Sequence, residues 1–126
     1  NNMTIEKIDL YPDYDFTFSS CVVAGDFVFT SHVAGSDEEG KWSESVEEQT
    51  EHCFRRLEGI LEAAGATLGD VVKTTVYLKN IEDFAKMRAV YRRQFTDGYP
   101  ARMTATSAFI DPEVLVMIEA VAYKPG

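Results

Sequence analysis

The pattern of apolar and polar residues changes its period several times along the chain, and each change predicts an element. Residues 46–64 repeat apolar side chains at three- and four-residue spacing, which is the period of one helical face. Ser45 and Glu48 match a capping box before this segment, and Gly65 stands where a helix C-cap belongs. The segment is therefore predicted to be a helix with one buried face and one acidic, solvated face, and His52 beside that polar face receives no functional role.

A second helix is expected over residues 81–96, with Asn80 as its N-cap and the acids Glu82 and Asp83 in its first turn. One apolar stripe repeats along it and is interpreted as core. The stripe consists of Phe84, Met87, Val90 or Tyr91, and Phe95.

Strand patterns occupy most of the remaining chain. Residues 19–24 and 27–33 are two apolar runs around an Ala-Gly-Asp turn signal, which predicts a hairpin. Residues 101–109 and 114–123 are expected to be two strands joined by a turn that contains Asp111-Pro112. Further strands are expected over residues 5–10 and 71–79, and residues 34–42 are expected to form an exposed loop.

These elements predict an α+β fold in which two helices pack on one face of a mixed sheet. Residues 114–123 and 27–30 are apolar without polar alternation, which is typical of strands covered on both faces. Two helices can cover only one face of a sheet. The other face is therefore expected to be buried by another copy of the chain, in a homo-oligomer.

Composition narrows the classes of partner. The 126 residues fit one domain over residues 1–126, and their formal net charge of −9 disfavours nucleic acid and anionic membrane surfaces. No apolar run approaches the roughly 20 residues of a membrane span, and no signal peptide is recognisable. Cys21 and Cys53 have no metal-like or redox-like spacing and are expected to be buried thiols. We expect a cytoplasmic protein that needs no metal.

Two charged residues interrupt the apolar C-terminal region and are candidates for chemistry. Arg102 is at the start of one expected strand, and Glu119 is the single charge within the last one. Each residue could simply face water at the surface. Alternatively, the two could face one pocket, where the arginine binds a carboxylate or phosphate and the glutamate orients or deprotonates a water. These residues by themselves leave both interpretations open.

The order of short motifs resembles the RidA family, also called YjgF/YER057c/UK114, over roughly residues 18–123. The matching pieces are Glu48-Gln49-Thr50, Ala63-Ala64-Gly65-Ala66, Asp70-Val71-Val72-Lys73, Val76-Tyr77-Leu78, Asp83-Phe84, Pro100-Ala101-Arg102 and Ile118-Glu119-Ala120-Val121-Ala122, preceded by Gly25-Asp26 and Phe29-Thr30-Ser31. The resemblance implies a chorismate-mutase-like fold and a homotrimer with sheets facing the centre and clefts between subunits.

The resemblance also implies an activity, which is hydrolysis of reactive 2-enamine or 2-imine carboxylic acids to 2-keto acids and ammonia, without a cofactor. By match to the family, Arg102 is expected to grip the substrate carboxylate and Glu119 to help place the water. Phe18, Ser19 and Ser31 match further cleft positions. His32, Met103 and Thr104 complete the expected substrate-binding set.

Several positions depart from the family pattern. Phe18 lacks the hydroxyl of the usual tyrosine, and Ser31-His32-Val33 stands where Ser-Gly-Gln is common. Arg88 stands in place of a common asparagine, and Met103-Thr104 replaces Ser-Cys or Ser-Thr. The carboxylate anchor is therefore retained while the residues that shape the pocket have changed. Two other functions are weighed beside the deaminase, namely a binding module for small carboxylates and, disfavoured by the charge, an endoribonuclease.

Overall fold

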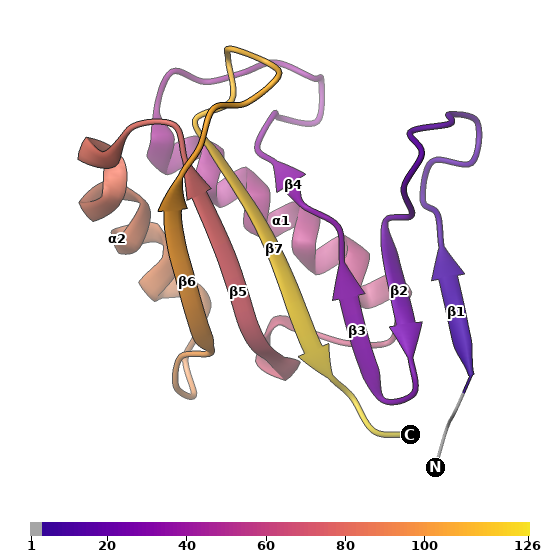
Figure 1. Ribbon diagram of the computed structural model, residues 1–126. Helices are drawn as coiled ribbons and strands as arrows, with labels where there is room; N and C mark the ends of the chain where they lie inside the picture. The colour runs from indigo at the N-terminus through magenta and orange to yellow at the C-terminus, as the bar shows by residue number, and fades with distance from the viewer. Residues whose placement is uncertain (1–3) are drawn as a thin grey trace.

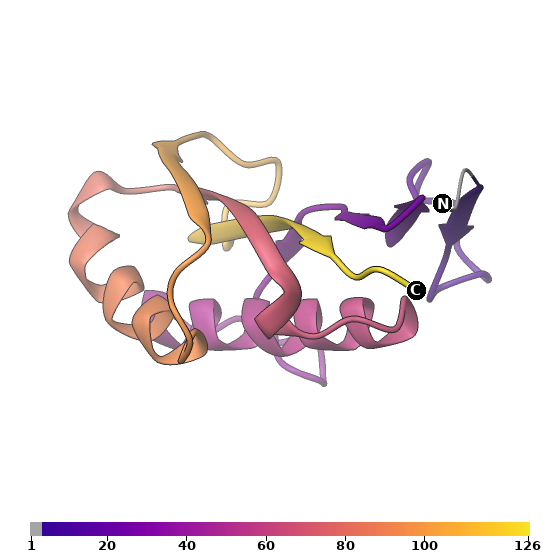
Figure 2. The same cartoon turned by 90° about the horizontal axis from the view of Figure 1, so that it is seen from below.

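The computed structural model describes residues 4–126 and shows one mixed, seven-stranded sheet with two helices packed on one of its faces (Figures 1 and 2). Residues 1–3 of the expected domain lie outside the described residues. The strands are β1 (Ile5–Ile8), β2 (Cys21–Ala24), β3 (Phe27–Thr30), β4 (Val33–Ala34), β5 (Val71–Leu78), β6 (Ala101–Thr106) and β7 (Val116–Tyr123). The helices are α1 (Val46–Ala63) and α2 (Phe84–Gln94), and two short 3₁₀ turns, η1 (Leu68–Asp70) and η2 (Ile81–Asp83), precede β5 and α2.

The strand order is β1-β2-β3-β7-β5-β6, with the short β4 also paired to β7. β5 and β6 are parallel, and the other pairs are antiparallel. Both expected C-terminal strands form, as β6 and β7. β5 lies between them in the sheet, so β6 and β7 do not form a hairpin with each other. A parallel neighbour needs a long crossover, and α2 supplies it between β5 and β6. Consequently β7 lies in the middle of the sheet and β6 at its edge (Figure 1).

Helix α1 matches its predicted length and ends. Ser45 has an extended backbone, and its hydroxyl accepts a hydrogen bond from the Glu48 amide. At the other end Gly65 has a φ of +79°, its N–H donates to Glu62, and the Ala66 N–H donates to Leu61. These two bonds are the Schellman arrangement that ends many helices.

The second helix begins later than predicted. Residues 81–83 form the 3₁₀ turn η2, and α2 starts at Phe84 and ends at Gln94. Asn80 makes no side-chain capping hydrogen bond, so the prediction of Asn80 as the helix cap is wrong. The predicted apolar stripe is confirmed, because Met87, Val90 and Tyr91 are buried.

The strands are shorter than the sequence pattern indicates, and the first hairpin shows one structural reason. Its turn is Gly25-Asp26, with a Gly25 φ of +61° as a two-residue hairpin requires. β3 ends at Thr30 rather than at residue 33, and pairing resumes in β4. Three residues, 30–32, thus lie opposite the two residues Glu119 and Ala120 of β7. Such an irregularity redirects side chains away from the regular alternation.

The core lies between the sheet and the helices and includes two fully buried polar residues of α1, Gln49 and Thr50. Gln49 is fully buried, its Nε2 donates to the carbonyls of Ser43 and Glu113, and its Oε1 accepts from the Leu115 amide. Gly35 lies directly against this turn, where an added Cβ would stand 1.9 Å from the Gln49 carbonyl oxygen. Close approach of the loop to α1 therefore requires glycine.

Both helices lie on one side of the sheet, so neither covers its other face (Figure 2). That face carries exposed apolar side chains. Phe27, Phe29 and Tyr123 pack against one another across β3 and β7, yet each remains more than two-fifths exposed. Tyr77 and Met103 lie on the same face of β5 and β6 by register. We call this surface the open face. Within residues 4–126 no helix is long and apolar enough to cross a membrane.

Candidate functional site

Arg102 lies on the edge strand β6 and faces the helix layer. Its Cα partner is Thr74 of β5, whose side chain is buried beneath α2. The guanidinium carbon lies 5.2 Å from the ring centroid of Tyr91 and 5.4 Å from that of Phe84. Cation–π contacts of this kind hold the charge in place without neutralising it. Arg102 remains exposed and forms no ion pair with any carboxylate of residues 4–126.

The layer beneath this arginine is polar and fixed. The Tyr91 hydroxyl and the Thr74 hydroxyl lie 2.7 Å apart in a hydrogen bond. Burial raises the pKa of the Tyr91 phenol, and the Thr74 bond and the Arg102 charge oppose that rise. Tyr91 therefore stays a neutral hydroxyl and offers Arg102 an aromatic face.

Thr104 follows Arg102 on the same face of β6, paired with Val76. Among residues 4–126, Thr104 Oγ1 is the one buried side-chain nitrogen or oxygen without a hydrogen-bond partner. A buried polar group without a hydrogen-bond partner lowers the stability of the fold by about 1 to 3 kcal/mol. The strand that carries the expected anchor thus also carries an unsatisfied hydroxyl two residues away.

A small pocket of about 300 Å³ surrounds Arg102. It is formed by the second half of α2 and the segment that leads into β6. Its lining consists of Arg88, Tyr91, Arg92, Tyr99, Pro100 and Arg102. We call it the arginine pocket, because three of these six residues are arginines.

Glu119 lies on the other side of the sheet. Its neighbours along β7, Ile118 and Ala120, are buried beneath the helices, so the alternation places Glu119 on the open face. Met103 shares this face, with Thr75 between the two in register, and is 59% exposed. The interpretation in which Arg102 and Glu119 face one pocket is therefore wrong within a single chain. The reason is that successive residues of a strand point to opposite faces of the sheet. Arg102 pairs with Thr74 of β5, whereas Glu119 pairs with the next residue, Thr75.

The remaining expected residues gather around the end of the first hairpin. The Ser31 hydroxyl donates to the Ser19 carbonyl at 2.6 Å, and the Ser31 amide donates to the Ser20 carbonyl. The rings of Phe18 and His32 lie 5.5 Å apart. By register Ser31 and His32 also face the part of β7 that contains Glu119. One chain thus holds two separate groups of expected site residues. The first group is Arg102 and Thr104. The second is Phe18, Ser19, Ser31 and His32, with Glu119 beside it.

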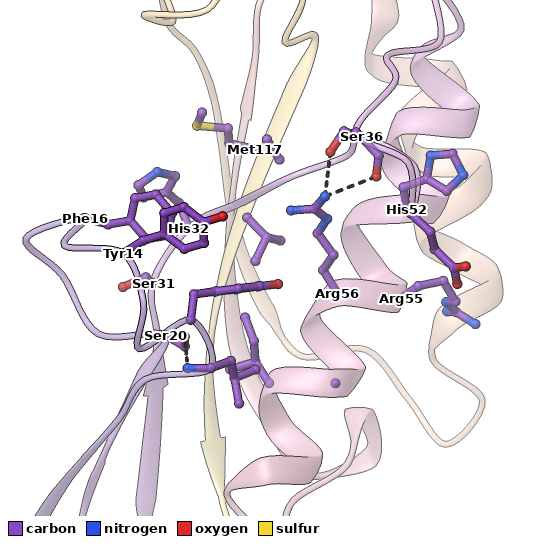
Figure 3. A pocket seen from close by; sticks show the side chains of 18 of the residues that line it. Tyr14, Phe16, Ser20, Ser31, His32, Ser36, His52, Arg55, Arg56 and Met117 are labelled. Carbon is purple, nitrogen blue, oxygen red and sulfur yellow. Dashed lines mark hydrogen bonds between the residues drawn. The ribbon is translucent and has the colours of Figure 1, made fainter.

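Three members of the second group, Phe18, Ser31 and His32, line a larger cleft of about 1050 Å³ between the N-terminal segment and α1 (Figure 3). Stacked rings form one wall, with 5.5 Å between the centroids of Tyr14 and Phe16 and 5.8 Å between Phe16 and Phe18. The α1 wall presents His52, Arg55 and Arg56. We call the whole cleft the aromatic cleft. The sequence interpretation gave its α1 wall no role, although the spacing of residues 52, 55 and 56 places them on neighbouring helical positions.

Hydrogen bonds hold the α1 wall of the aromatic cleft in place. His52, which the sequence pattern placed beside the polar face, is half-buried, with Nδ1 3.3 Å from the Gly35 carbonyl oxygen. Arg56 donates to the hydroxyl and carbonyl of Ser36. Backbone N–H groups of Lys41 and Glu39 lower the pKa of the neighbouring Asp37 carboxyl. Within the described part of the chain no group of three or more metal-ligating side chains gathers.

Comparison with known proteins adds to this geometry. Residues 12–124 match the family model described as Endoribonuclease L-PSP. A RutC family protein of Pyrococcus abyssi is 40% identical over 109 residues, covering 85% of this chain and 86% of the relative. A 2-iminobutanoate/2-iminopropanoate deaminase of Salmonella typhimurium is 36% identical over 104 residues, covering 79% and 81%. The crystal structure of a YjgF/YER057c/UK114 family member from Mycobacterium tuberculosis superposes with a TM-score of 0.84 at 29% identity, over 95% of this chain and 99% of the other.

Proposed function

Because this chain belongs to the RidA (YjgF/YER057c/UK114) family, whose model is described as Endoribonuclease L-PSP, we propose that it hydrolyses 2-imino and 2-enamino carboxylic acids. A water adds to the carbon of the C=N bond and the C–N bond then breaks. The oxygen stays in a 2-keto acid, and the nitrogen leaves as ammonia. The enamine form reaches the same path after a proton moves from nitrogen to carbon.

The observation that carries this proposal is the free guanidinium of Arg102 in a pocket without an acid. The two aromatic rings beneath it fix its position, and among residues 4–126 no carboxylate lines the arginine pocket. A guanidinium presents a planar fork that matches a carboxylate, and a substrate carboxylate would supply the missing partner. Thr104 Oγ1 offers a second polar group on the same strand face.

Glu119 takes the role of orienting or deprotonating the water. Since Arg102 and Glu119 of one chain lie on opposite sheet faces, we place the site between copies of the chain. The edge strand β6 of one subunit brings Arg102, and the next subunit brings Glu119 with the Phe18, Ser19, Ser31 and His32 group. This arrangement is a cytoplasmic homotrimer with three equivalent clefts.

The first test measures ammonia released from an imino acid that an amino-acid oxidase generates in the same vessel. Arg102→Lys keeps the charge but removes the fork, so kcat/KM should fall about ten- to a hundredfold, equivalent to about 1.5 to 3 kcal/mol. Arg93→Lys is the matched control, because Arg93 is an exposed arginine of α2 outside the arginine pocket. Unchanged turnover in Arg102→Lys would place the anchor elsewhere.

The second test examines whether the site is shared between subunits. We expect Arg102→Lys and Glu119→Gln each to lose at least nine-tenths of the activity when expressed alone, roughly the loss of a charge-assisted contact. When both are co-expressed, about a quarter of the clefts in randomly mixed trimers should combine one intact Arg102 with one intact Glu119. Activity should then return to roughly that fraction of the wild-type value. If mixing restores nothing while mixed trimers form, both residues act from the same chain.

The same assay separates the deaminase from the alternatives. A binding module for small carboxylates would bind pyruvate or 2-oxobutanoate through Arg102 yet release no ammonia above the uncatalysed rate. An endoribonuclease would cleave RNA in a fraction that co-elutes with the protein. The net charge of −9 opposes approach of a polyanion such as RNA, so the small-molecule reaction is the function we propose.

A further inference from the structure

The arginine pocket holds more positive charge than one substrate carboxylate requires. Arg88, Arg92 and Arg102 all line it, together with two tyrosines and a proline, and no acidic residue does. The chain as a whole carries 21 acidic residues against 12 basic ones. Three guanidiniums without a carboxylate are therefore an exception to the charge balance of this molecule.

The three arginines line the same pocket, and two of them contact the same aromatic ring. The guanidinium carbon of Arg88 lies 5.3 Å from the centroid of the Phe84 ring, and that of Arg102 lies 5.4 Å from the same centroid. The two charges are therefore at most about 10.7 Å apart, the sum of these two distances. Arg92 follows Arg88 by four residues and so lies on the same face of α2. None of the three forms an ion pair with a carboxylate of residues 4–126.

The fold by itself gives no reason for this grouping. Like charges four residues apart on a helix destabilise it by about 0.2 to 0.5 kcal/mol. The negative end of the helix dipole explains a cation in the last turn of α2, where Arg92 and Arg93 lie. That explanation does not reach Arg88, which lies a full turn earlier. The attraction of each guanidinium to an anion in the pocket would offset the repulsion among the three side chains.

We propose that the arginine pocket binds small dicarboxylates, with one carboxylate on Arg102 and the second on Arg88 and Arg92. On the proposed function, which this statement refines, the preferred substrate is a 2-imino dicarboxylic acid rather than an imino acid with an apolar side chain. Phosphate is the alternative anion, since arginines bind it as well, but the backbone N–H groups of a helix N-terminus that many phosphate sites use are absent here, because Arg92 stands in the C-terminal turn of α2.

Calorimetric titration with unreactive ligands tests the binding site independently of turnover. Succinate should bind at least tenfold more tightly than butyrate at the same ionic strength, because only succinate carries the second carboxylate. Arg88→Asn should remove most of this difference, because it weakens succinate binding far more than butyrate binding. Arg93→Asn removes the same charge from an exposed position of α2 outside the pocket, and it should leave both affinities unchanged.

Three results would overturn the proposal. The first is equal affinity for succinate and butyrate in the unmodified protein. The second is an equal loss in Arg88→Asn and Arg93→Asn, which would mean that only the overall charge matters. The third is tighter binding of phosphoglycolate than of succinate, which would assign the pocket to phosphate. Light scattering should give the same mass for Arg88→Asn as for the unmodified chain, and dissociation would show that these arginines pair with another subunit instead.

Turnover separates this inference from the proposed deaminase. Imino acids are generated from aspartate by aspartate oxidase and from leucine by a broad amino-acid oxidase. Faster ammonia release from the aspartate product, lost in Arg88→Asn and kept in Arg93→Asn, supports both proposals. Equal turnover of the two products, unaffected by Arg88→Asn, leaves the deaminase standing and rejects the dicarboxylate preference. Dicarboxylate binding without any ammonia release supports the dicarboxylate site and rejects the deaminase.

Discussion

Gln49 ties two distant segments to the first turns of α1. Its amide group makes three hydrogen bonds of 2.8 to 2.9 Å, to Ser43 and Glu113 carbonyls and from the Leu115 amide. Leu115 directly precedes β7, so the same side chain helps to set where the central strand begins. A fully buried amide is favourable only while all its partners remain in place.

Gln49→Ala should therefore lower the free energy of unfolding by about 3 kcal/mol or more, because it leaves three backbone groups without their partner. Urea unfolding followed by circular dichroism gives the change directly. Glu48→Ala, at the exposed neighbouring position, should cost no more than about 0.5 kcal/mol. Similar losses in the two variants would mean that water replaces the Gln49 bonds.

The buried thiol of Cys53 gives a prediction about pH. Burial raises its pKa to about 12, and the side chain lies within 3.6 Å of the Val33 carbonyl. The folded thiol stays protonated where the unfolded thiol already ionises, so its contribution to stability is complete below about pH 8.5 and is lost as the pH rises towards 12. In that window Cys53→Ala should show a slope of unfolding free energy smaller by up to about 1.4 kcal/mol per pH unit. Equal slopes would contradict a protonated, buried thiol.

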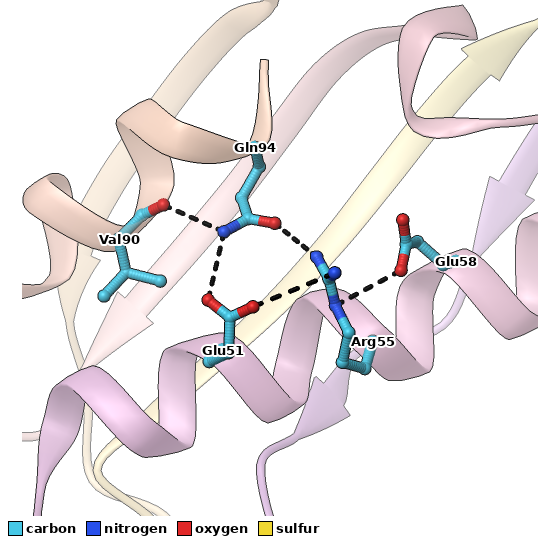
Figure 4. A network of polar contacts seen from close by, with 5 residues as sticks. All are labelled: Glu51, Arg55, Glu58, Val90 and Gln94. Atoms are coloured by element: carbon cyan, nitrogen blue, oxygen red, sulfur yellow. Dashed lines mark hydrogen bonds and ion pairs between the residues drawn. The ribbon is translucent and has the colours of Figure 1, made fainter. Parts of the chain in front are cut away.

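At the scale of elements, a polar network joins the outer surfaces of the two helices (Figure 4). Gln94, the last residue of α2, accepts from Arg55 and donates to Glu51 of α1 and to the Val90 carbonyl. Arg55 also lies 3.8 Å from Glu51 and 3.2 Å from Glu58. All three charged side chains are two-fifths to one-half exposed, so water and salt screen their ion pairs.

Gln94→Ala should cost about 0.5 to 1.5 kcal/mol, since it removes the α2 side chain to which both Arg55 and Glu51 of α1 are hydrogen-bonded. Glu58→Gln should cost less than about 0.5 kcal/mol, and 1 M salt should reduce even that effect. Urea titrations at low and high salt measure both values. A larger loss in Glu58→Gln than in Gln94→Ala would mean that the ion pairs, and not the amide, join the helices.

At the scale of the whole molecule, the open face is the largest feature that a single chain leaves unexplained. Phe27, Phe29 and Tyr123 form a packed aromatic group that is 42 to 45% exposed. Monomeric proteins rarely leave such contiguous apolar surface in water. The position of Glu119 on this face connects assembly to the proposed chemistry.

Light scattering should therefore give a mass of about 42 kDa, which corresponds to three copies of the 14.1 kDa chain. Phe29→Glu places a charge on the open face and should dissociate the assembly. Ile81→Glu is its control, because Ile81 is 73% exposed in η2, away from the open face. A monomer at micromolar concentration in the unmodified protein would contradict both the trimer and the shared site.

Much of the fold could be predicted because local rules decided it. The ends of α1 follow from Ser45 and Gly65, and the first hairpin follows from its Gly-Asp turn. Strand order could not be predicted in this way. Residues 101–109 and 114–123 are adjacent in sequence, yet β5 separates the strands they contain, because pairing energy depends on partners from anywhere in the chain. Asn80 failed as a cap for a similar reason, since the 3₁₀ turn η2 intervenes.

The sequence by itself determined which residue types stand ready for chemistry, namely one arginine and one glutamate in apolar strands and a chain of family motifs around them. Their residue numbers did not reveal which side of the sheet each would occupy. Tertiary structure decided that, because side chains alternate along a strand and the β5 register pairs Arg102 with Thr74 but Glu119 with Thr75. A difference of one residue in register thus separates the two groups within the chain. Tertiary structure also brings Arg102 against the Phe84 ring, which Arg88 contacts too, and only the position of α2 beside β6 could create this grouping.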